Sequence, residues 1–340
     1  MKKNGKLIFR ITLAVVFFVT FSLVVFSNTD YPERPVTMVV PWSAGGSTDI
    51  CARAFQFPFQ GALGVPVVVN NMPGGSALVG SEFVLNADPD GYTLLFSSDS
   101  PGHWRALGLS PTTSWQDFNP LMILTIYYST VCVNADSKWN TIDELIEDIR
   151  NRPGEISVGI AGMGASAHTM SLLLEKFADI KLKIIPYQGG GPANVGLLNK
   201  EVDLSFGLIA EVLDYVENGD FKLLATFTEE RVPDFPDIPT VSEKLPELKP
   251  WIKGSTFASI CSPKGTPDEI NEILVNAAKE AIKDPKWLEA AKNMNFVTPY
   301  YTGEEAVKFV EDWGNLKSWI FYEAGIAEHS PEEFGIPKPY

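Results

Sequence analysis

One local pattern, a strand followed by a glycine-rich turn and the start of a helix, occurs once in each half of the chain. The first copy is VVPWSAGGSTD at 39–49 and the second is VGIAGMGASAH at 158–168. A third polar turn, YQGGGPA at 187–193, follows Ile184 and Ile185. Glycine lets the backbone approach a ligand closely, and the helix behind the turn offers unpaired N–H groups and the positive end of its dipole. The pattern therefore predicts an α/β fold whose turns can bind an anion.

The chemistry of these turns favours a carboxylate over a polyphosphate. No Lys or Arg lies in any of them, and the nearest, Arg53, lies further along the first helix. The Gly-Lys-Ser/Thr of a phosphate-binding loop is absent, and Ala167 stands where a dinucleotide fingerprint needs glycine. Donors would be backbone N–H groups and the hydroxyls of Ser43, Ser47, Thr48, Ser166 and Thr169. A tight strand–helix connection that binds nothing remains the alternative.

Strands and helices alternate along the chain. Short apolar runs predict strands at 36–40, 67–69, 93–96, 130–133, 155–160, 183–185, 204–206 and 223–227. Helical spacing predicts helices over about 48–60 and 166–177, and helix-start patterns at Thr141, Thr266 and Thr302 predict three more. This order indicates α/β with mostly parallel sheets.

Composition excludes several classes of protein. The 340 residues are 45% hydrophobic and 20% charged, which excludes a disordered or collagen-like chain. The net charge of −15 argues against a nucleic-acid partner, which needs basic patches. Three histidines and no nucleophile-elbow or zinc-protease motif argue against an enzyme, a metal or another cofactor. The widely spaced cysteines are expected to be small buried residues, although export would permit one disulfide: Cys51, Cys132 and Cys261.

The first residues have the pattern of a secretory signal peptide. Four basic residues precede the apolar run Ile11–Phe26, and removal of 1–27 would leave the mature chain more acidic. The run is short for a transmembrane helix, and cleavage is favoured over an uncleaved N-terminal anchor.

An ordered set of short motifs resembles one receptor family over nearly the whole mature chain. VVPWSAGGSTDICAR at 39–53 is followed by VVNNMPGG at 68–75, PDGYTLL at 89–95 and PYQGGGPA at 186–193. Arg231 with FPDIPTVSE at 235–243, and then PKGTP at 263–267, complete the set. These motifs resemble the extracytoplasmic solute receptors of the tripartite tricarboxylate transporters, the TctC or Bug type. His168 stands one position earlier than in the family pattern.

The resemblance implies a type II periplasmic-binding fold, in which two hinged α/β lobes close on a ligand. Lobe 1 would hold 30–126 plus 252–340 and lobe 2 would hold 127–251, with hinge crossings near 126–129 and 251–255. It also implies a monomer that passes a small carboxylate to the small and large membrane subunits of a permease. The residues expected at the ligand are Trp42, Ser43, Ala44, Gly45, Gly46, Ser47, Thr48, Asp49, Ser98, Gly162, Met163, Gly164, Ala165, Ser166, His168, Tyr187, Gly189 and Gly190.

Individual side chains carry narrower expectations. A hydrogen-bonding or capping role is favoured for His168, and a cap or lid-ordering role for Asp49, over acid–base work. Asp99 or His103 is expected to face the distal end of the ligand. The sequence leaves the identity of the carboxylate open. Three other functions also stay open: a sensor of the same fold that signals to a membrane partner, an exported α/β hydrolase or lyase, and a structural surface protein.

Overall fold

The computed structural model describes residues 30–252 and 254–338, so the expected signal peptide lies outside the described residues. The chain separates into Met1–Glu33 and Arg34–Tyr340, and every helix and strand named here belongs to the second unit. None of the helices in the described ranges is long and apolar enough to cross a membrane.

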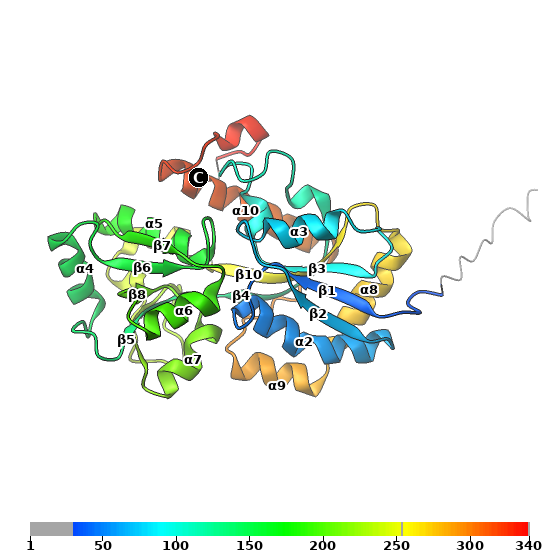
Figure 1. The fold of residues 1–340 in the computed structure, drawn as a ribbon, viewed down its shortest axis with the longest axis horizontal. Coiled ribbons are helices and arrows are strands. Elements are labelled where there is room, and N and C mark those ends of the chain that lie inside the picture. The colour runs from blue at the N-terminus through cyan, green and yellow to red at the C-terminus, as the bar shows by residue number, and fades with distance from the viewer. Residues whose placement is uncertain (1–29, 253, 339–340) are drawn as a thin grey trace, which may run out of the picture. The chain divides into compact units, whose positions relative to one another are not determined.

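The first sheet combines strands from the two ends of the chain. Its order is β2 (Val67–Asn71), β1 (Val36–Val40), β3 (Thr93–Ser97), β10 (Thr256–Pro263) and β4 (Phe118–Tyr127). β1 runs parallel to β2 and β3, whereas β10 is antiparallel to both β3 and β4. Its helices are α2 (Ser47–Leu63), α3 (Leu78–Leu85), α8 (Asp268–Ala281) and α9 (Pro285–Asn293). Figure 1 shows these elements around one sheet.

The second sheet is built from the middle of the chain and repeats the same plan. Its order is β7 (Lys183–Pro186), β6 (Ser157–Ile160), β8 (Leu204–Ser205), β5 (Thr130–Asn134) and β9 (Phe221–Thr226). β6 is parallel to β7 and β8, and β5 is antiparallel to β8 and β9. Its helices, drawn in green in Figure 1, are α4 (Ile142–Asn151), α5 (Ser166–Ala178), α6 (Gly190–Leu198) and α7 (Ile209–Glu217). Short 3₁₀ turns lie at Ser100–Gly102, Trp115–Asp117, Val241–Glu243, Pro246–Trp251 and Pro331–Phe334.

Each sheet has its own apolar core, and the long helix α10 (Gly303–Glu323) contributes to both. Val310 and Trp313 pack with Phe257 of the first sheet. Ile320, two turns further along α10, packs with Val158 and other residues of the second core. The two sheets therefore share a helix, which is why Arg34–Tyr340 forms one compact unit.

The chain passes between the sheets at two adjacent points. Ser129, after β4, donates its N–H to Ser255 Oγ (2.7 Å), and Ser255 donates its own N–H to Tyr127 O (2.8 Å). Gly254 has φ +126°, and a side chain there would collide with Ile126 and Trp313. These crossings lie where the hinge is expected. The lobe limits and the hinge motion stay a prediction.

The structure confirms the α/β class and corrects three details. In each sheet two strand pairings are parallel and two are antiparallel, so the sheets are not mostly parallel. The reason is that the strand after each crossing, β5 or β10, runs in the reverse direction to its neighbours. The helix expected at Thr266 begins at Asp268, and the Thr266 hydroxyl donates to Pro263 O instead of capping it. Thr302 does hold the N-cap position of α10, but its side chain makes no capping hydrogen bond.

Candidate functional site

The first and third glycine-rich turns touch each other across the two sheets. Ser43, in the turn between β1 and α2, donates its hydroxyl to Gln188 O (2.8 Å) in the turn between β7 and α6. A Cβ on Gly189 would lie 3.3 Å from Ser43 N, and one on Gly191 would lie 3.0 Å from Ala44 O. Glycine at these two positions is what allows the backbones to come so close.

The second turn, between β6 and α5, lies against the same region of the first sheet. Gly162 has φ +149°, and a Cβ there would lie 3.1 Å from Ser76 Oγ and 3.7 Å from the Trp42 ring. The Trp42 indole N–H donates to Ser98 Oγ (3.1 Å), which fixes the ring beside this turn. The structure thus brings all three turns together.

Asp49 orders the first turn. Its carboxylate accepts hydrogen bonds from Gly45 N (3.0 Å), Arg53 Nε (3.0 Å) and Asn71 Nδ2 (2.9 Å). Burial alone would raise the pKa of Asp49, but these hydrogen bonds outweigh burial and lower it. The ionised carboxylate therefore holds the turn in shape. The expected cap or lid-ordering role stays a prediction.

A second carboxylate, which the sequence analysis missed, reaches the first turn from the other sheet. Glu211 of α7 accepts the Ser47 N–H with Oε1 (2.6 Å) and the Leu208 N–H with Oε2 (3.4 Å). Burial raises the pKa of Glu211, although these donors act in the opposite direction. Glu211 is the third residue of its helix, where an acidic residue is common, so the sequence pattern alone predicts no more than a helix cap.

His168 holds the second turn from within. Burial lowers the pKa of His168 to about 4, so the ring is neutral at pH 7 and its Nδ1 accepts the Gly164 N–H (3.0 Å). A Cβ on Gly164 would lie 2.9 Å from His103 Nε2, and both imidazole rings contact Phe321. The hydrogen-bonding role favoured for His168 is therefore present, and the ring itself is buried.

The remaining expected residues differ in their exposure. Ala44, Gly45 and Met163 are exposed. The buried members are Trp42, Gly46, Ser47, Thr48, Asp49, Ser98, Gly162, Gly164, Ala165, His168 and Gly189, whereas Ser43, Ser166, Tyr187 and Gly190 are partly buried. The Tyr187 hydroxyl donates to Glu201 (3.3 Å), and its ring packs over Gly159 and Gly196. The Tyr187 side chain thus contacts residues of the same half of the molecule, around the second sheet, rather than the other turns.

Asp99, one of the two residues expected at the distal end of the ligand, is buried and paired within the chain. It forms a buried ion pair with Lys317 of α10 (2.5 Å) and accepts hydrogen bonds from Thr256 Oγ1 (2.6 Å) and Trp313 Nε1 (3.0 Å). Lys317 also donates to Ser255 O (2.7 Å), at the crossing between the sheets. Lys317 and Asp99 lie 218 residues apart in the sequence, so no local pattern reveals this pair. His103, the other candidate, is buried as well.

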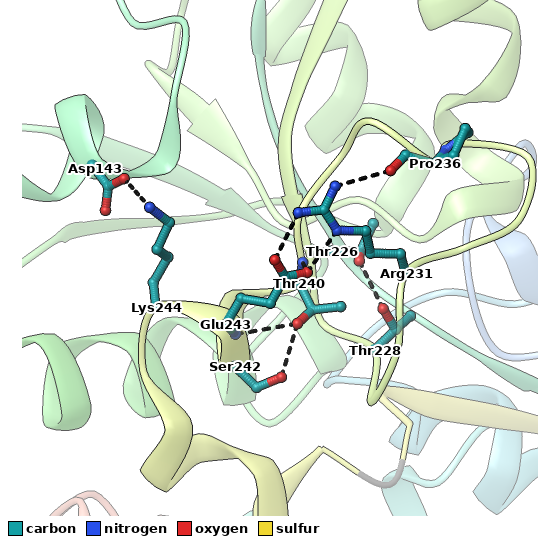
Figure 2. Close-up of polar contacts among 9 residues, drawn as sticks. All are labelled: Asp143, Thr226, Thr228, Arg231, Pro236, Thr240, Ser242, Glu243 and Lys244. Atoms are coloured by element: carbon teal, nitrogen blue, oxygen red, sulfur yellow. Dashed lines mark hydrogen bonds and ion pairs between the residues drawn. The ribbon is translucent and has the colours of Figure 1, made fainter.

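The late family motif forms a structural loop rather than a part of this site. Figure 2 shows the Arg231 guanidinium, which donates hydrogen bonds to both carboxylate oxygens of Glu243 (2.8 and 2.7 Å) and to Pro236 O (3.0 Å). Glu243 accepts the Thr240 N–H (3.0 Å), and Thr240 Oγ1 accepts the Glu243 N–H (3.3 Å). The Arg231 guanidinium lowers the pKa of Glu243 to about 2. The motif thereby fixes the loop that follows β9.

Other candidate sites are of different kinds. A cavity of about 650 Å³ opens between residues 228–234 and 291–297, and none of the expected ligand residues lines it. Across the described ranges, no three His, Cys, Asp or Glu side chains are grouped closely enough to hold a metal ion. The cysteines are buried and unpaired, as expected: Cys51, Cys132 and Cys261.

The chain is similar in sequence to a family of receptors and in structure to a periplasmic binding protein. A model of the tripartite tricarboxylate transporter family receptors matches residues 51–326. Protein BugT of Bordetella pertussis is 31% identical over 299 residues, which cover 86% of this chain and 89% of BugT. The solved periplasmic binding protein BugD has a TM-score of 0.80 and 31% identity, covering 87% of this chain and 99% of BugD.

A more distant structure shares the fold. Rpa4515 of R. palustris, solved with adipate, has a TM-score of 0.80 at 24% identity and covers 88% of this chain and 99% of its own. The expected two-lobe binding-protein architecture is thus confirmed. The match spans most of the chain, and the chain therefore belongs to the tripartite tricarboxylate transporter family of receptors.

Proposed function

We propose that this protein is an extracytoplasmic solute-binding receptor that captures a small carboxylate between its two lobes. It is exported by its N-terminal segment and delivers the bound carboxylate to the small and large membrane subunits of a tripartite tricarboxylate permease. It binds its ligand without chemically altering it.

One observation carries the proposal: three glycine-rich turns from two sheets meet, and the N-terminus of α2 points into their meeting place. The Gly45 and Ser47 N–H groups of this turn both hold carboxylates of the chain itself, those of Asp49 and Glu211. A backbone segment that binds two carboxylates of the chain has suitable donors for the carboxylate of a ligand. The Ser47 hydroxyl is buried beside them and makes no hydrogen bond of normal geometry with any described residue.

The absence of basic residues from the turns limits the charge of the ligand group held there. Donors of this kind neutralise one carboxylate through dipoles and hydrogen bonds, whereas a phosphate cluster calls for Lys or Arg as well. The chain carries a net charge of −15, so long-range attraction gives an anionic ligand no help. Recognition at this site is therefore short-ranged.

Thermal unfolding of the mature protein against a panel of ligands tests the proposal. The panel holds citrate, adipate, succinate, an acidic amino acid and benzoate, with sugars, amines and nucleotides as controls. A ligand at 100 times its Kd adds about 2.7 kcal/mol of stability, which raises Tm by roughly 5–10 °C. The carboxylate that gives the shift is expected to be recovered unchanged. A shift with a control class only, or turnover of the ligand, contradicts the proposal.

A pair of serine variants locates the binding. Ser47→Ala removes the buried hydroxyl at the α2 N-terminus and is expected to weaken carboxylate binding by about tenfold or more, because hydrogen bonds to charged groups contribute roughly 1.5–3 kcal/mol. Ser81→Ala is the matched control, since Ser81 is buried in α3 and its hydroxyl donates to Ala77 O. Equal affinities for the two variants would show that the carboxylate binds elsewhere.

A further inference from the structure

We propose that the Glu211 carboxylate fills a carboxylate-binding site of this receptor as an internal stand-in, which the carboxylate of the ligand displaces. This inference rests on the proposed function in one respect, the carboxylate nature of the ligand. It assigns the position that the ligand takes and the group that competes for that position.

The N-termini of three helices meet at this carboxylate. Its Oε1 accepts the N–H of Ser47, the first residue of α2, and its Oε2 accepts the N–H of Leu208, the N-cap of α7. Gly190, the first residue of α6, lies so close that a Cβ there would come within 2.4 Å of Glu211 Oε1. These helices come from both sheets, so a carboxylate at this point binds both halves of the molecule at once.

Two buried donors at the same point are left incompletely satisfied by Glu211. Ser47 Oγ and Asn194 Nδ2 lie near enough to the carboxylate to lower the pKa of Glu211. Neither atom makes a hydrogen bond of normal geometry to any described residue, although both side chains are only 1% exposed. A buried donor without a partner is costly, so a carboxylate free to take its own orientation would satisfy more of the site than Glu211 does.

The Glu211 side chain is partly buried in this position. Its other neighbours are Tyr127, which donates to Ser47 O, and Cys132. Among the described residues, the hydrogen bonds to its carboxylate come from no Lys, Arg or His. Burial raises the pKa of Glu211, which means that the ionised side chain is less stable here than in water. Its free energy therefore falls when it moves out to water. A ligand that arrives with its own carboxylate therefore displaces Glu211 at low cost.

Acetate, the same chemical group as the end of the glutamate side chain, tests the site directly. Glu211→Ala empties the position, and acetate is expected to raise the Tm of this variant in a concentration-dependent way that equal sodium chloride does not reproduce. Glu217→Ala is the matched control, because Glu217 is an exposed glutamate on the same helix. The wild-type protein and the control are expected to need about tenfold or more acetate for the same shift, because Glu211 competes for the position.

The ligand panel gives the second measurement. The carboxylate bound by the wild-type protein is expected to bind Glu211→Ala about tenfold or more tightly, because one competing carboxylate has been removed. Glu211→Gln keeps the size of the side chain and loses its charge, so it serves if the alanine variant fails to fold, and the same direction is expected. Unchanged or weaker binding in these variants would overturn the proposal and make Glu211 either a bystander or a ligand contact.

The two measurements separate this inference from the proposed function. If no panel carboxylate binds any variant but acetate stabilises Glu211→Ala at lower concentrations than the wild-type protein, the receptor function fails while the stand-in holds. If a panel carboxylate binds the wild-type protein but neither acetate nor the variants change anything, the function holds and the stand-in is overturned.

Discussion

Replacing Lys317 by methionine removes the positive partner of the buried ion pair at the crossing between the sheets. The side chains of Lys317 and Asp99 are 3% and 2% exposed. Methionine fills most of the lysine volume, so the main consequence is a buried carboxylate that keeps only its hydrogen bonds from Thr256 and Trp313. The Ser255 carbonyl loses the Lys317 hydrogen bond as well.

Breaking one side of a buried pair costs about 3–5 kcal/mol, because the remaining charge stays desolvated without compensation. For a chain of this size that corresponds to a loss of roughly 6–20 °C in Tm. Asp99→Asn combined with Lys317→Met removes both charges, so the double variant is expected to recover most of the loss. Lys308→Met is the matched control, since Lys308 lies on the same helix but is exposed, and its stability should hardly change.

The pH dependence gives the sharper assay. Burial alone would raise the pKa of Asp99, but Lys317 and the hydrogen bonds outweigh burial and lower it. The ionised pair therefore contributes stability that is present above about pH 4 and is lost as the pH falls further. Without Lys317, burial raises the pKa of Asp99, so the deficit of the variant is largest near pH 7 and shrinks as Asp99 takes up a proton toward pH 4.

Denaturant unfolding of the wild-type protein, both Lys317 variants and the control, at pH 7 and at pH 4.5, measures these differences. A Lys317→Met deficit of the same size at both pH values would refute the reasoning. So would a double variant that is less stable than Lys317→Met alone.

Three further predictions concern the turns, the late motif and the thiols. Gly164→Ala is expected to lower Tm and weaken ligand binding, because Gly164 has φ +81° and a Cβ there would lie 2.7 Å from Leu107 and 2.9 Å from His103; a Tm within error of the wild type would contradict this. Since Arg231 lowers the pKa of Glu243 to about 2, their pair supplies stability above about pH 4.5 that is lost as the pH falls through about 2. In the Arg231→Leu variant, Tm should fall less steeply as the pH drops through this acidic range. A fall as steep as in the wild-type protein would show that the Arg231–Glu243 pair is not the cause of the acid-induced loss. Native protein should resist iodoacetamide at pH 8 while denatured protein reacts, because burial raises the thiol pKa to about 12 for Cys51, Cys132 and Cys261.

Apart from β4 and β10, the sequence predicts the described strands of both sheets. β1, β3, β5 and β7 were expected from short apolar runs, and the helices behind the first two glycine-rich turns begin within about a residue of the expected positions. These elements are specified locally, by strand propensity, glycine and helix caps. Their agreement explains why the fold class was predictable.

Two strands, β4 and β10, escaped the sequence analysis. They pair with each other over their lengths although they lie far apart in the chain, and β10 inserts between β3 and β4. Such pairing is fixed by the tertiary structure, not by a nearby turn. The sequence analysis identified 251–255 as a hinge crossing but did not predict β10, which begins at the next residue, Thr256.

The same distinction applies to the site. Turn residues such as Gly45 and Ser47 could be named because glycine and hydroxyl donors before a helix have a recognisable pattern. Glu211 and Lys317 could not, because each lies on an ordinary helix and takes its role only when a distant segment packs against it. Polar groups whose partners lie in another part of the chain are the part of this site that a single sequence does not reveal.

A crystal structure of the mature protein with the panel carboxylate that stabilises it most is the most direct test of this account. We expect a carboxylate oxygen of the ligand within about 3 Å of Ser47 N. We also expect the Glu211 side chain to have moved away from that position. A ligand bound elsewhere, such as in the cavity between 228–234 and 291–297, with Glu211 still on Ser47, would contradict it.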